Sequence, residues 1–538
     1  MPVRHGSESY FVLGEGLLIE SQGGRRGTEP AFTTATARTT ATVARAAVTA
    51  PPFRFSRIGP KGAQLSQATM EKLAIAMTAG DAGPSTLPAG FTYLGQFVDH
   101  DLSFDKTSVA LGDSAAPAEL LQARSPSLDL DSLYGAGPGD PVSARFYRDA
   151  VHLKMGRTAA VGPDEAREGF DLPRAGSGAT AAARREALIP DPRNDENLAV
   201  AQTHLAFIRF HNRVVDTLPA TPPAQRFAQA RRRVVAHYQW MLRHDLLPRI
   251  CDPAVVDDVF ANGRKVFEVG VDATSVPTMP IEFSVATYRF GHSMIRPAYS
   301  WNRRFDDGTG SLDLLFTFSA TSGNLGGGRR LPSNWIADFR RLYDFTEAGR
   351  NDLRIPEARF NRAKRIDTRL VRALRNLPTG SFGGPAVPFN DPTANLAFRN
   401  LMRARMVRLA TGQQMAELMR ARGLAVTDLT RAQIRDGDGG ASLESLTAAQ
   451  RSAVLDDTPL LFYILREAEL NDGKLAGVGA RILAETFHRA MEGSQPSIVR
   501  DPGWRPSFGP DSDTFRMVDL LLFAFEGQKS LLAPLGGN

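Results

Sequence analysis

The sequence predicts a mainly α-helical fold with few, short strands. Long amphipathic segments at residues 198–217 and 224–247 carry apolar residues at helical spacing. Residues 415–532 also have mostly helical patterns, which are clearest at 457–469 and 477–491. The chain has 538 residues, of which 42% are hydrophobic, so it is long enough to bury a large core. We therefore expect one large helical body.

The N-terminal 50 residues differ from the rest of the chain. Residues 1–50 are rich in Gly, Thr, Ala and Arg and have little helical periodicity, which is typical of an extended arm. Residues 51–538 contain the helical patterns and are predicted to form a single domain.

Charge and cysteine content exclude several classes of protein. Lys and Arg number 64 against 58 Asp and Glu, a formal net charge of +6, and the basic residues are scattered through mixed-charge segments. Nucleic-acid binding is therefore not indicated, because it would need a concentrated basic face. Cys251 is the single cysteine, which excludes a disulfide within the chain. The composition, rich in Ala, Arg and Gly, is typical of a GC-rich bacterial source.

The sequence contains no pattern of a membrane-spanning helix. It has no run of 18 or more apolar residues. Its N-terminus lacks the basic-then-apolar pattern of a classical signal peptide, because the apolar stretch 10–19 is short and includes Glu15. We expect a protein that resides in the cytoplasm or is exported by a non-classical route.

The segment 89–101 carries many polar groups for a helix whose other residues are apolar. Its apolar residues recur at roughly helical spacing, which predicts a helix. Gln96 and His100 are then four residues apart on one face, with Asp99 on the same side. Asp101 is rotated by about 100° from His100, so it faces elsewhere. A lone His on such a helix is more often structural than functional, so the segment needs supporting motifs.

Residues 125–135 alternate oxygen-bearing side chains with apolar ones in a loop flanked by Pro and Gly. Such a loop suits a hard cation, which takes six to eight oxygen ligands from carboxylates, hydroxyls and carbonyls. The same alternation of Ser and Asp is also common in loops that bind nothing, so by itself it leaves both interpretations open.

Further candidate functional residues lie before and after the two long helices. Arg193 and Glu196 lie three residues apart just before the 198–217 helix, where they could be no more than a surface pair with a favourable helix-dipole interaction. A predicted amphipathic helix over 281–297 carries His292, with Arg289 three residues earlier on the same face.

These segments resemble, in the correct order, motifs of the animal-type haem peroxidases, the peroxidase–cyclooxygenase superfamily. Gly-Gln-x-x-Asp-His-Asp at 95–101 resembles the signature on the distal side of the haem, and 125–135 resembles the calcium loop that ends in Tyr-Gly. Arg and Glu before a long helix, Arg-Phe-Gly-His at 289–292 and Asn-x-x-Arg-x-Arg at 400–405 resemble three further motifs. The resemblance covers about residues 80–410 and implies a helical core around haem b.

On the distal side, the resemblance implies catalytic roles for three residues. His100 would take a proton from hydrogen peroxide and return it to the departing oxygen. Arg193 would stabilise the negative charge on the breaking O–O bond, and Gln96 would hydrogen-bond a distal water or small anion. Asp99 and Glu196 would form ester links to haem methyl groups.

On the opposite side, the resemblance implies a proximal ligand and its supporting residues. His292 would be the axial ligand of the haem iron, and Asn400 would accept the N–H of its imidazole ring. Arg289 and Arg403 would hold haem propionates. After this motif the usual Asp-His-Gly of the family is replaced by Met-Val-Arg at 406–408.

The resemblance also implies a Ca²⁺ site next to His100. Side-chain ligands would be Asp101, Ser125, Asp129 and Asp131, with a carbonyl ligand from Ser127. Ser125 and Asp131 stand where the animal pattern has Thr and Ser, and both exchanges keep an oxygen.

The implied activity is that of a peroxidase that reduces hydrogen peroxide and oxidises small organic donors or halides through a ferryl intermediate. A third, sulfonium haem bond is not expected, because Asn197 stands where the mammalian enzymes have Met.

Two alternative functions stay open. Fatty-acid dioxygenases and cyclooxygenases have a radical-forming Tyr three residues before the proximal His, where this chain has Arg289, with Tyr288 one residue earlier. The other alternative is a module that binds haem or calcium and catalyses no reaction.

Overall fold

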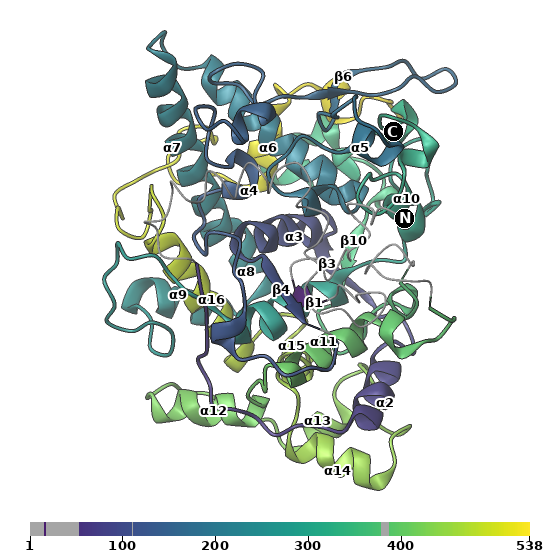
Figure 1. Ribbon diagram of the computed structural model, residues 1–538, viewed down its shortest axis with the longest axis vertical. Coiled ribbons are helices and arrows are strands. Elements are labelled where there is room, and N and C mark those ends of the chain that lie inside the picture. Colours follow the sequence, from purple (N-terminus) through teal and green to yellow (C-terminus); the bar gives the residue numbers. More distant parts are fainter. Residues whose placement is uncertain (1–14, 18–52, 110, 378–386, 538) are drawn as a thin grey trace.

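Helices make up most of the regular secondary structure among the described residues, as the sequence predicts. We describe it from a computed structural model that covers residues 15–17, 53–109, 111–377 and 387–537 (Figure 1). The longest helices are α6 (Leu198–Asp216), α7 (Pro223–Met241) and α16 (Gly477–Glu492). The remaining α-helices are α2 (Gln67–Met77), α3 (Gly90–Leu102), α4 (Asp131–Tyr134), α5 (Ala181–Arg185), α8 (Leu247–Ile250), α9 (Pro253–Asn262), α10 (Leu312–Thr317), α11 (Leu396–Met406), α12 (Gly412–Ala421), α13 (Arg431–Asp436), α14 (Ala448–Asp456), α15 (Leu460–Glu469), α17 (Met517–Ala524) and α18 (Lys529–Leu532).

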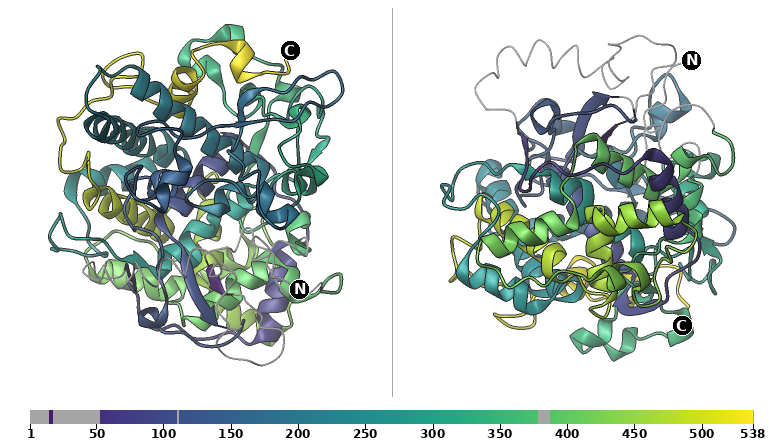
Figure 2. Two further views of the ribbon diagram at one scale, coloured as in Figure 1. Left: turned by 45° about the horizontal axis from the view of Figure 1, so that its top comes forward. Right: turned by 90° about the horizontal axis from the view of Figure 1, so that it is seen from below.

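Within the described ranges, the strands are short and form five separate two-stranded sheets; several of them can be followed in Figures 1 and 2. Two pairs are parallel: β1 (Glu15–Leu17) with β4 (Asp105–Val109), and β2 (Phe55–Ser56) with β7 (Met279–Pro280). Three pairs are antiparallel: β3 (Pro84–Pro88) with β10 (Arg362–Lys364), β5 (Gly156–Arg157) with β6 (Glu168–Asp171), and β8 (Ala298–Tyr299) with β9 (Gly310–Ser311).

Helix α3 lies near the centre of the molecule and is buried on nearly all sides (Figure 1). It packs against α6, where the ring of Phe97 stacks on Phe207 with the centroids 4.4 Å apart. Its first residue, Gly90, faces the ring of Tyr343 so closely that a Cβ atom would lie 2.2 Å from Tyr343 Cζ. The hydroxyl of Tyr343 donates to the Gly90 carbonyl, which fixes where α3 begins. Burial on all sides explains why polar residues on α3 must find partners.

One continuous hydrophobic core runs from Phe55 to Leu532. The predicted boundary between the arm and the domain, at residues 50 and 51, lies outside the described residues, as does most of the arm. Both the arm and the single domain over 51–538 therefore stay predictions.

The predicted helix over 281–297 is present but irregular. It consists of a π-helix, η6 (Glu282–Ala286), followed by a 3₁₀-helix, η7 (Thr287–Met294). The two parts meet at Ala286, whose φ of −127° and ψ of −65° are not those of an α-helix. The side chain of Arg289 donates to the carbonyl of Ser284 at 2.8 Å, across this junction. Such departures from α-geometry occur often at functional sites.

Among the described residues, no helix is long and apolar enough to cross a membrane. The clearest long apolar helices are instead packed within the core.

Candidate active site

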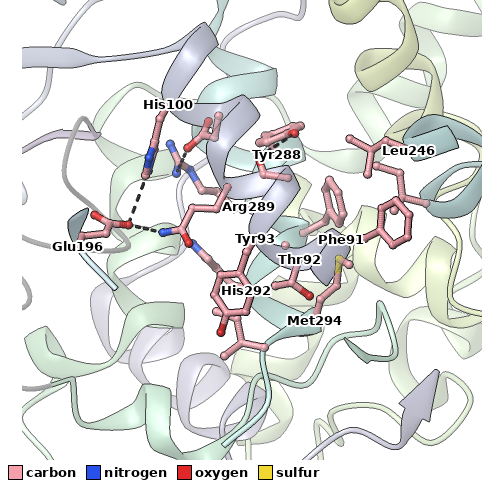
Figure 3. A pocket seen from close by; sticks show the side chains of 17 residues that line it. Phe91, Thr92, Tyr93, His100, Glu196, Leu246, Tyr288, Arg289, His292 and Met294 are labelled. Carbon is pink, nitrogen blue, oxygen red and sulfur yellow. Dashed lines mark hydrogen bonds and ion pairs between the residues drawn. The ribbon is translucent and has the colours of Figure 1, made fainter. Parts of the chain in front are cut away.

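A cavity lies between α3 and the η6–η7 segment, and both predicted His residues, His100 and His292, line it (Figure 3). It encloses about 630 Å³ of space, part of it open to solvent. Polar residues gather around His100, whereas Phe91, Leu246 and Met294 form an apolar wall on the other side (Figure 3).

The imidazole ring of His100 is buried and held by residues of the loop before α6. Its Nδ1 atom lies 2.9 Å from Asn194 Oδ1, and its Nε2 atom lies 3.6 Å from Glu196 Oε1. Burial, reinforced by the nearby Arg193 guanidinium, lowers the pKa of His100 to about 4. The ring is therefore neutral at physiological pH, the state that a general base requires.

Glu196 faces the same cavity and is incompletely hydrogen-bonded. Its Oε1 atom accepts a hydrogen bond from the amide of Gln96, whose own oxygen accepts from Asn197 Nδ2 at 2.9 Å. Its Oε2 atom is buried and has no hydrogen-bond partner among the described residues. Burial raises the pKa of Glu196 well above its usual range. Such a carboxyl group, which is buried beside a cavity and has one oxygen atom without a hydrogen-bond partner, is well suited to bond to a molecule that occupies the cavity.

Asp99 and Arg289 join the two sides of the cavity. Arg289 Nη1 donates to Asp99 Oδ2 at 3.2 Å, and both residues line the cavity. The helix α3 places Asp99, Gln96 and His100 on one face, as the spacing predicted. Tyr288 also lines the cavity, and its hydroxyl donates to the Gly95 carbonyl at 3.1 Å.

His292 is buried and paired with Asn400 of α11. Asn400 Nδ2 lies 2.9 Å from His292 Nδ1, while Asn400 Oδ1 is buried and has no hydrogen-bond partner in the part of the chain that the structure describes. The fold brings the two residues together although 108 positions separate them in the sequence, and the role of Asn400 as acceptor of the ring N–H stays a prediction.

Two of the predicted arginines have carboxylate partners and do not line the cavity. Arg193 binds Asp191 through Nε at 3.0 Å and Nη2 at 2.7 Å, and it also donates to the His100 carbonyl at 3.0 Å. Arg403 pairs with the buried carboxylate of Asp105. The catalytic role of Arg193 and the propionate contact of Arg403 stay predictions.

Asp101 faces away from the cavity, as predicted, and belongs to a group of three carboxylates. Oxygen atoms of Asp101, Asp129 and Asp131 all lie within 4.8 Å of one another. Burial and the negative charge of Asp131 raise the pKa of Asp129 to about 7. One buried and two partly buried carboxylates at this distance repel one another, and a cation would remove that cost.

The two predicted serine ligands lie beside these carboxylates. The Ser125 hydroxyl donates to Asp129 Oδ2 at 3.3 Å, so its oxygen belongs to the same group. The Ser127 carbonyl accepts the Asp129 N–H at 3.0 Å.

Sequence reasoning missed four residues that orient the predicted ones. Asp191 could have been found, because an Asp two residues before Arg193 at the start of a 3₁₀-helix, η4 (Pro192–Asp195), is a common cap. Asn194, Asp105 and Arg124 contact partners far along the chain, and no local pattern points to them.

Residues 92–324 match the family model described as animal haem peroxidase. Over this range the chain is similar to the animal haem peroxidases. The matched range includes His100, Arg193, Glu196 and His292, whereas Asn400 lies beyond it.

Relatives of the peroxidase domain match only part of the chain. A peroxidase-like protein of Margaritifera margaritifera is 33% identical over 110 residues, which are 20% of this chain and 14% of that protein. Thyroid peroxidase of Rattus norvegicus is 27% identical over 203 residues, which are 34% of this chain and 20% of that protein. The chain therefore matches no more than about a fifth of the length of these two relatives.

Solved structures show that the fold extends beyond the matched domain. Peroxidase A from Dictyostelium discoideum superposes with a TM-score of 0.54 at 15% identity, over 90% of this chain and 94% of that one. A fatty acid alpha-dioxygenase from Oryza sativa gives a TM-score of 0.52 at 10% identity, over 88% and 79% of the two chains. These similarities confirm the predicted mainly α-helical, haem peroxidase-like fold and do not by themselves decide the activity.

Proposed function

We propose that the protein is a haem-dependent peroxidase that reduces hydrogen peroxide and oxidises small organic donors or halides. The observation that carries the proposal is the cavity between His100 and His292, because each ring is held by a separate amide partner. Bound haem would supply the electrons for peroxide reduction and recover them one at a time from donor molecules. With an organic donor the overall reaction consumes one peroxide and two hydrogen atoms from donors and releases two molecules of water; with a halide it consumes one peroxide, one halide ion and one proton and releases hypohalous acid and one molecule of water.

The protein residues would move the protons of this reaction. His100 is neutral and can accept a proton from hydrogen peroxide at Nε2, then return it to the oxygen that leaves as water. Gln96 can donate to an oxygen in the cavity, since its amide is already oriented by Asn197. Arg193 would stabilise developing negative charge if its guanidinium turned from Asp191 towards the cavity.

Haem fits the residues that line the cavity. His292 would hold the iron through the ring nitrogen opposite Asn400, and Arg289 would face a propionate. The buried, unpartnered Oε2 atom of Glu196 and the cavity-lining carboxylate of Asp99 are the groups that would form ester links. Extraction of the pigment with acidified acetone tests these links. We expect wild-type haem to stay with the protein and Glu196→Gln haem to become more extractable.

We further propose that Ca²⁺ binds to Asp101, Ser125, Ser127, Asp129 and Asp131. The site supplies oxygen ligands only, which Ca²⁺ prefers, and one of its ligands, Asp101, lies on the helix that carries His100. Its role would be to fix that helix.

Steady-state oxidation of a phenolic donor tests the proposed activity. We expect haem-loaded protein to oxidise the donor with hydrogen peroxide, and His100→Ala to be slower by about 10²–10⁴-fold, the usual contribution of a general acid–base group. Haem-loaded protein that leaves both peroxide and donor unchanged would contradict the proposal.

One observation favours a second candidate function, fatty-acid oxygenation. Tyr288 lines the same cavity, near the apolar residues Phe91 and Leu246. However, its hydroxyl is bound to the Gly95 carbonyl, and Arg289 stands where the oxygenases have their Tyr. Oxygen uptake with a fatty acid and no added peroxide, lost in Tyr288→Phe, would favour this function over the peroxidase.

A further inference from the structure

Arg124 joins two carboxylates from distant parts of the chain. Its Nη1 atom lies 3.2 Å from Asp131 Oδ1, and its Nη2 atom lies 2.5 Å from Asp191 Oδ2. Asp191 in turn binds Arg193 through both of its oxygens, at 3.0 Å and 2.7 Å. The side chains Asp131, Arg124, Asp191 and Arg193 therefore form one row of alternating charge, which we call the charge ladder.

Three of the four side chains of the charge ladder are buried and its two arginines rest on one aromatic ring, whereas the side chain of Asp131 is 21% exposed. The side chains of Arg124, Asp191 and Arg193 are 8%, 0% and 1% exposed. The guanidinium carbons of Arg193 and Arg124 lie 4.2 Å and 5.9 Å from the centroid of Phe104. Because water cannot replace a lost partner here, a change in one pair must be compensated within the ladder.

The two ends of the charge ladder lie at two different sites. Asp131 is one of the three carboxylates that suit a cation, and Arg193 contacts the carbonyl of His100. Arg124 divides its donors between the two carboxylates. A divalent cation beside Asp131 would neutralise that carboxylate and repel Arg124, so Arg124 would bind Asp191 more fully. Asp191 would then hold Arg193 less tightly, and Arg193 could turn towards the cavity.

We propose that Arg124 and Asp191 are positioning residues that couple cation binding at the three carboxylates to the position of the Arg193 guanidinium beside His100. This inference rests on the proposed haem and Ca²⁺ sites. Because coupling between two binding sites is reciprocal, the cation would strengthen binding of an anion in the cavity, and the anion would strengthen binding of the cation by the same factor.

Cyanide binding to the haem-loaded protein tests the coupling without measuring activity. The dissociation constant of cyanide is obtained from the shift of the Soret band, in excess Ca²⁺ and after removal of Ca²⁺ by a chelator. In the wild type we expect removal of Ca²⁺ to weaken cyanide binding by at least tenfold. In Arg124→Met we expect the two constants to agree within twofold, because the connection between Asp131 and Asp191 is lost.

Arg174→Met is the matched control. Arg174 is buried to a similar degree and also bridges two carboxylates, those of Asp171 and Asp195, but it belongs to no part of the charge ladder. We expect this variant to keep the tenfold effect of Ca²⁺. If Arg124→Met does not fold, Arg124→Lys is measured instead, since a lysine keeps the charge but cannot bind two carboxylates through a planar fork.

Three results would overturn the coupling. The first is that cyanide binding to the wild type does not depend on Ca²⁺. The second is that an Arg124 variant keeps the full effect of Ca²⁺ on cyanide binding, and the third is that Arg174→Met loses this effect to the same extent as the Arg124 variant. Each leaves the proposed peroxidase function intact, because haem is bound in all three. Folded protein that shows no Soret band would overturn the proposed function and the coupling together.

Discussion

The chemical state of His100 is decided by residues around it rather than by its own helix. Burial and the charge of Arg193 keep the ring neutral, and Asn194 contacts the Nδ1 atom. These neighbours come from the loop before α6, so an isolated α3 would not produce a general base. The tautomer with hydrogen on Nδ1 leaves Nε2 as the acceptor that peroxide requires.

The lowered pKa of His100 predicts the pH dependence of the reaction with peroxide. The ring is protonated below a pKa of about 4 and neutral above it. The second-order rate constant with hydrogen peroxide should therefore rise as the pH increases through about 4 and stay level up to neutral pH. Stopped-flow measurement of haem-loaded protein gives this profile. A rate that falls with increasing pH over the same range would contradict the role of His100 as base.

On the opposite side, Asn400 should control how firmly His292 holds iron. Replacement by Leu removes the partner of the imidazole Nδ1 atom, and changes of this kind commonly cost about 10–100-fold in metal affinity. We expect Asn400→Leu to release haem to an acceptor protein at least tenfold faster than the wild type. Asn395→Ala, at the cap of the same helix, is the control, because Asn395 bonds to backbone N–H groups and to the Thr78 hydroxyl rather than to His292. Equal release rates in both variants would mean that loss of helix stability explains the effect.

At the scale of elements, α3 connects the cavity, the three carboxylates and the core. Phe97 is fully buried and stacks on Phe207 of α6. Phe97→Ala should lower the free energy of unfolding by about 3–5 kcal/mol, the usual cost of this change in a core. Urea unfolding measures it, and Phe389→Ala is the control, since Phe389 is 80% exposed and should change stability by less than about 0.5 kcal/mol. A loss below about 1 kcal/mol in Phe97→Ala would contradict the central place of α3.

The sequence predicted elements well where a periodic apolar stripe dominates. Helices α3 and α6 were expected at 89–101 and 198–217, within two residues of their observed bounds. The irregular geometry of η6 and η7 was not predicted, because it depends on the bond from Arg289 to the Ser284 carbonyl rather than on apolar spacing.

Site residues on short motifs were likewise predictable, and their long-range partners were not. Asp99, Gln96 and His100 line one cavity because four-residue spacing places them on one face. The contact between Arg124 and Asp191 spans 67 residues, and that between Arg403 and Asp105 spans 298. Nothing in local sequence specifies such pairs, since they arise from how the helices pack.

At the scale of the whole molecule, Ca²⁺ should stabilise the fold, and more so at higher pH. Asp129 has its pKa raised to about 7 in the folded chain, mainly by burial, so without a cation its contribution to stability is lost as the pH rises through about 7. A bound cation removes this loss. We expect the rise in melting temperature with Ca²⁺ to be larger at pH 8 than at pH 5.5. Asp129→Asn should reduce the rise, whereas an equal rise at both pH values would contradict the site.

The absorption spectrum of the protein expressed with a haem precursor tests the central claim most directly. A Soret band in the wild type that is lost or shifted, with at least tenfold less bound haem, in His292→Ala is the result we predict. Folded wild-type protein without a Soret band, or an unchanged spectrum in His292→Ala, would contradict the assignment of the cavity as a haem site.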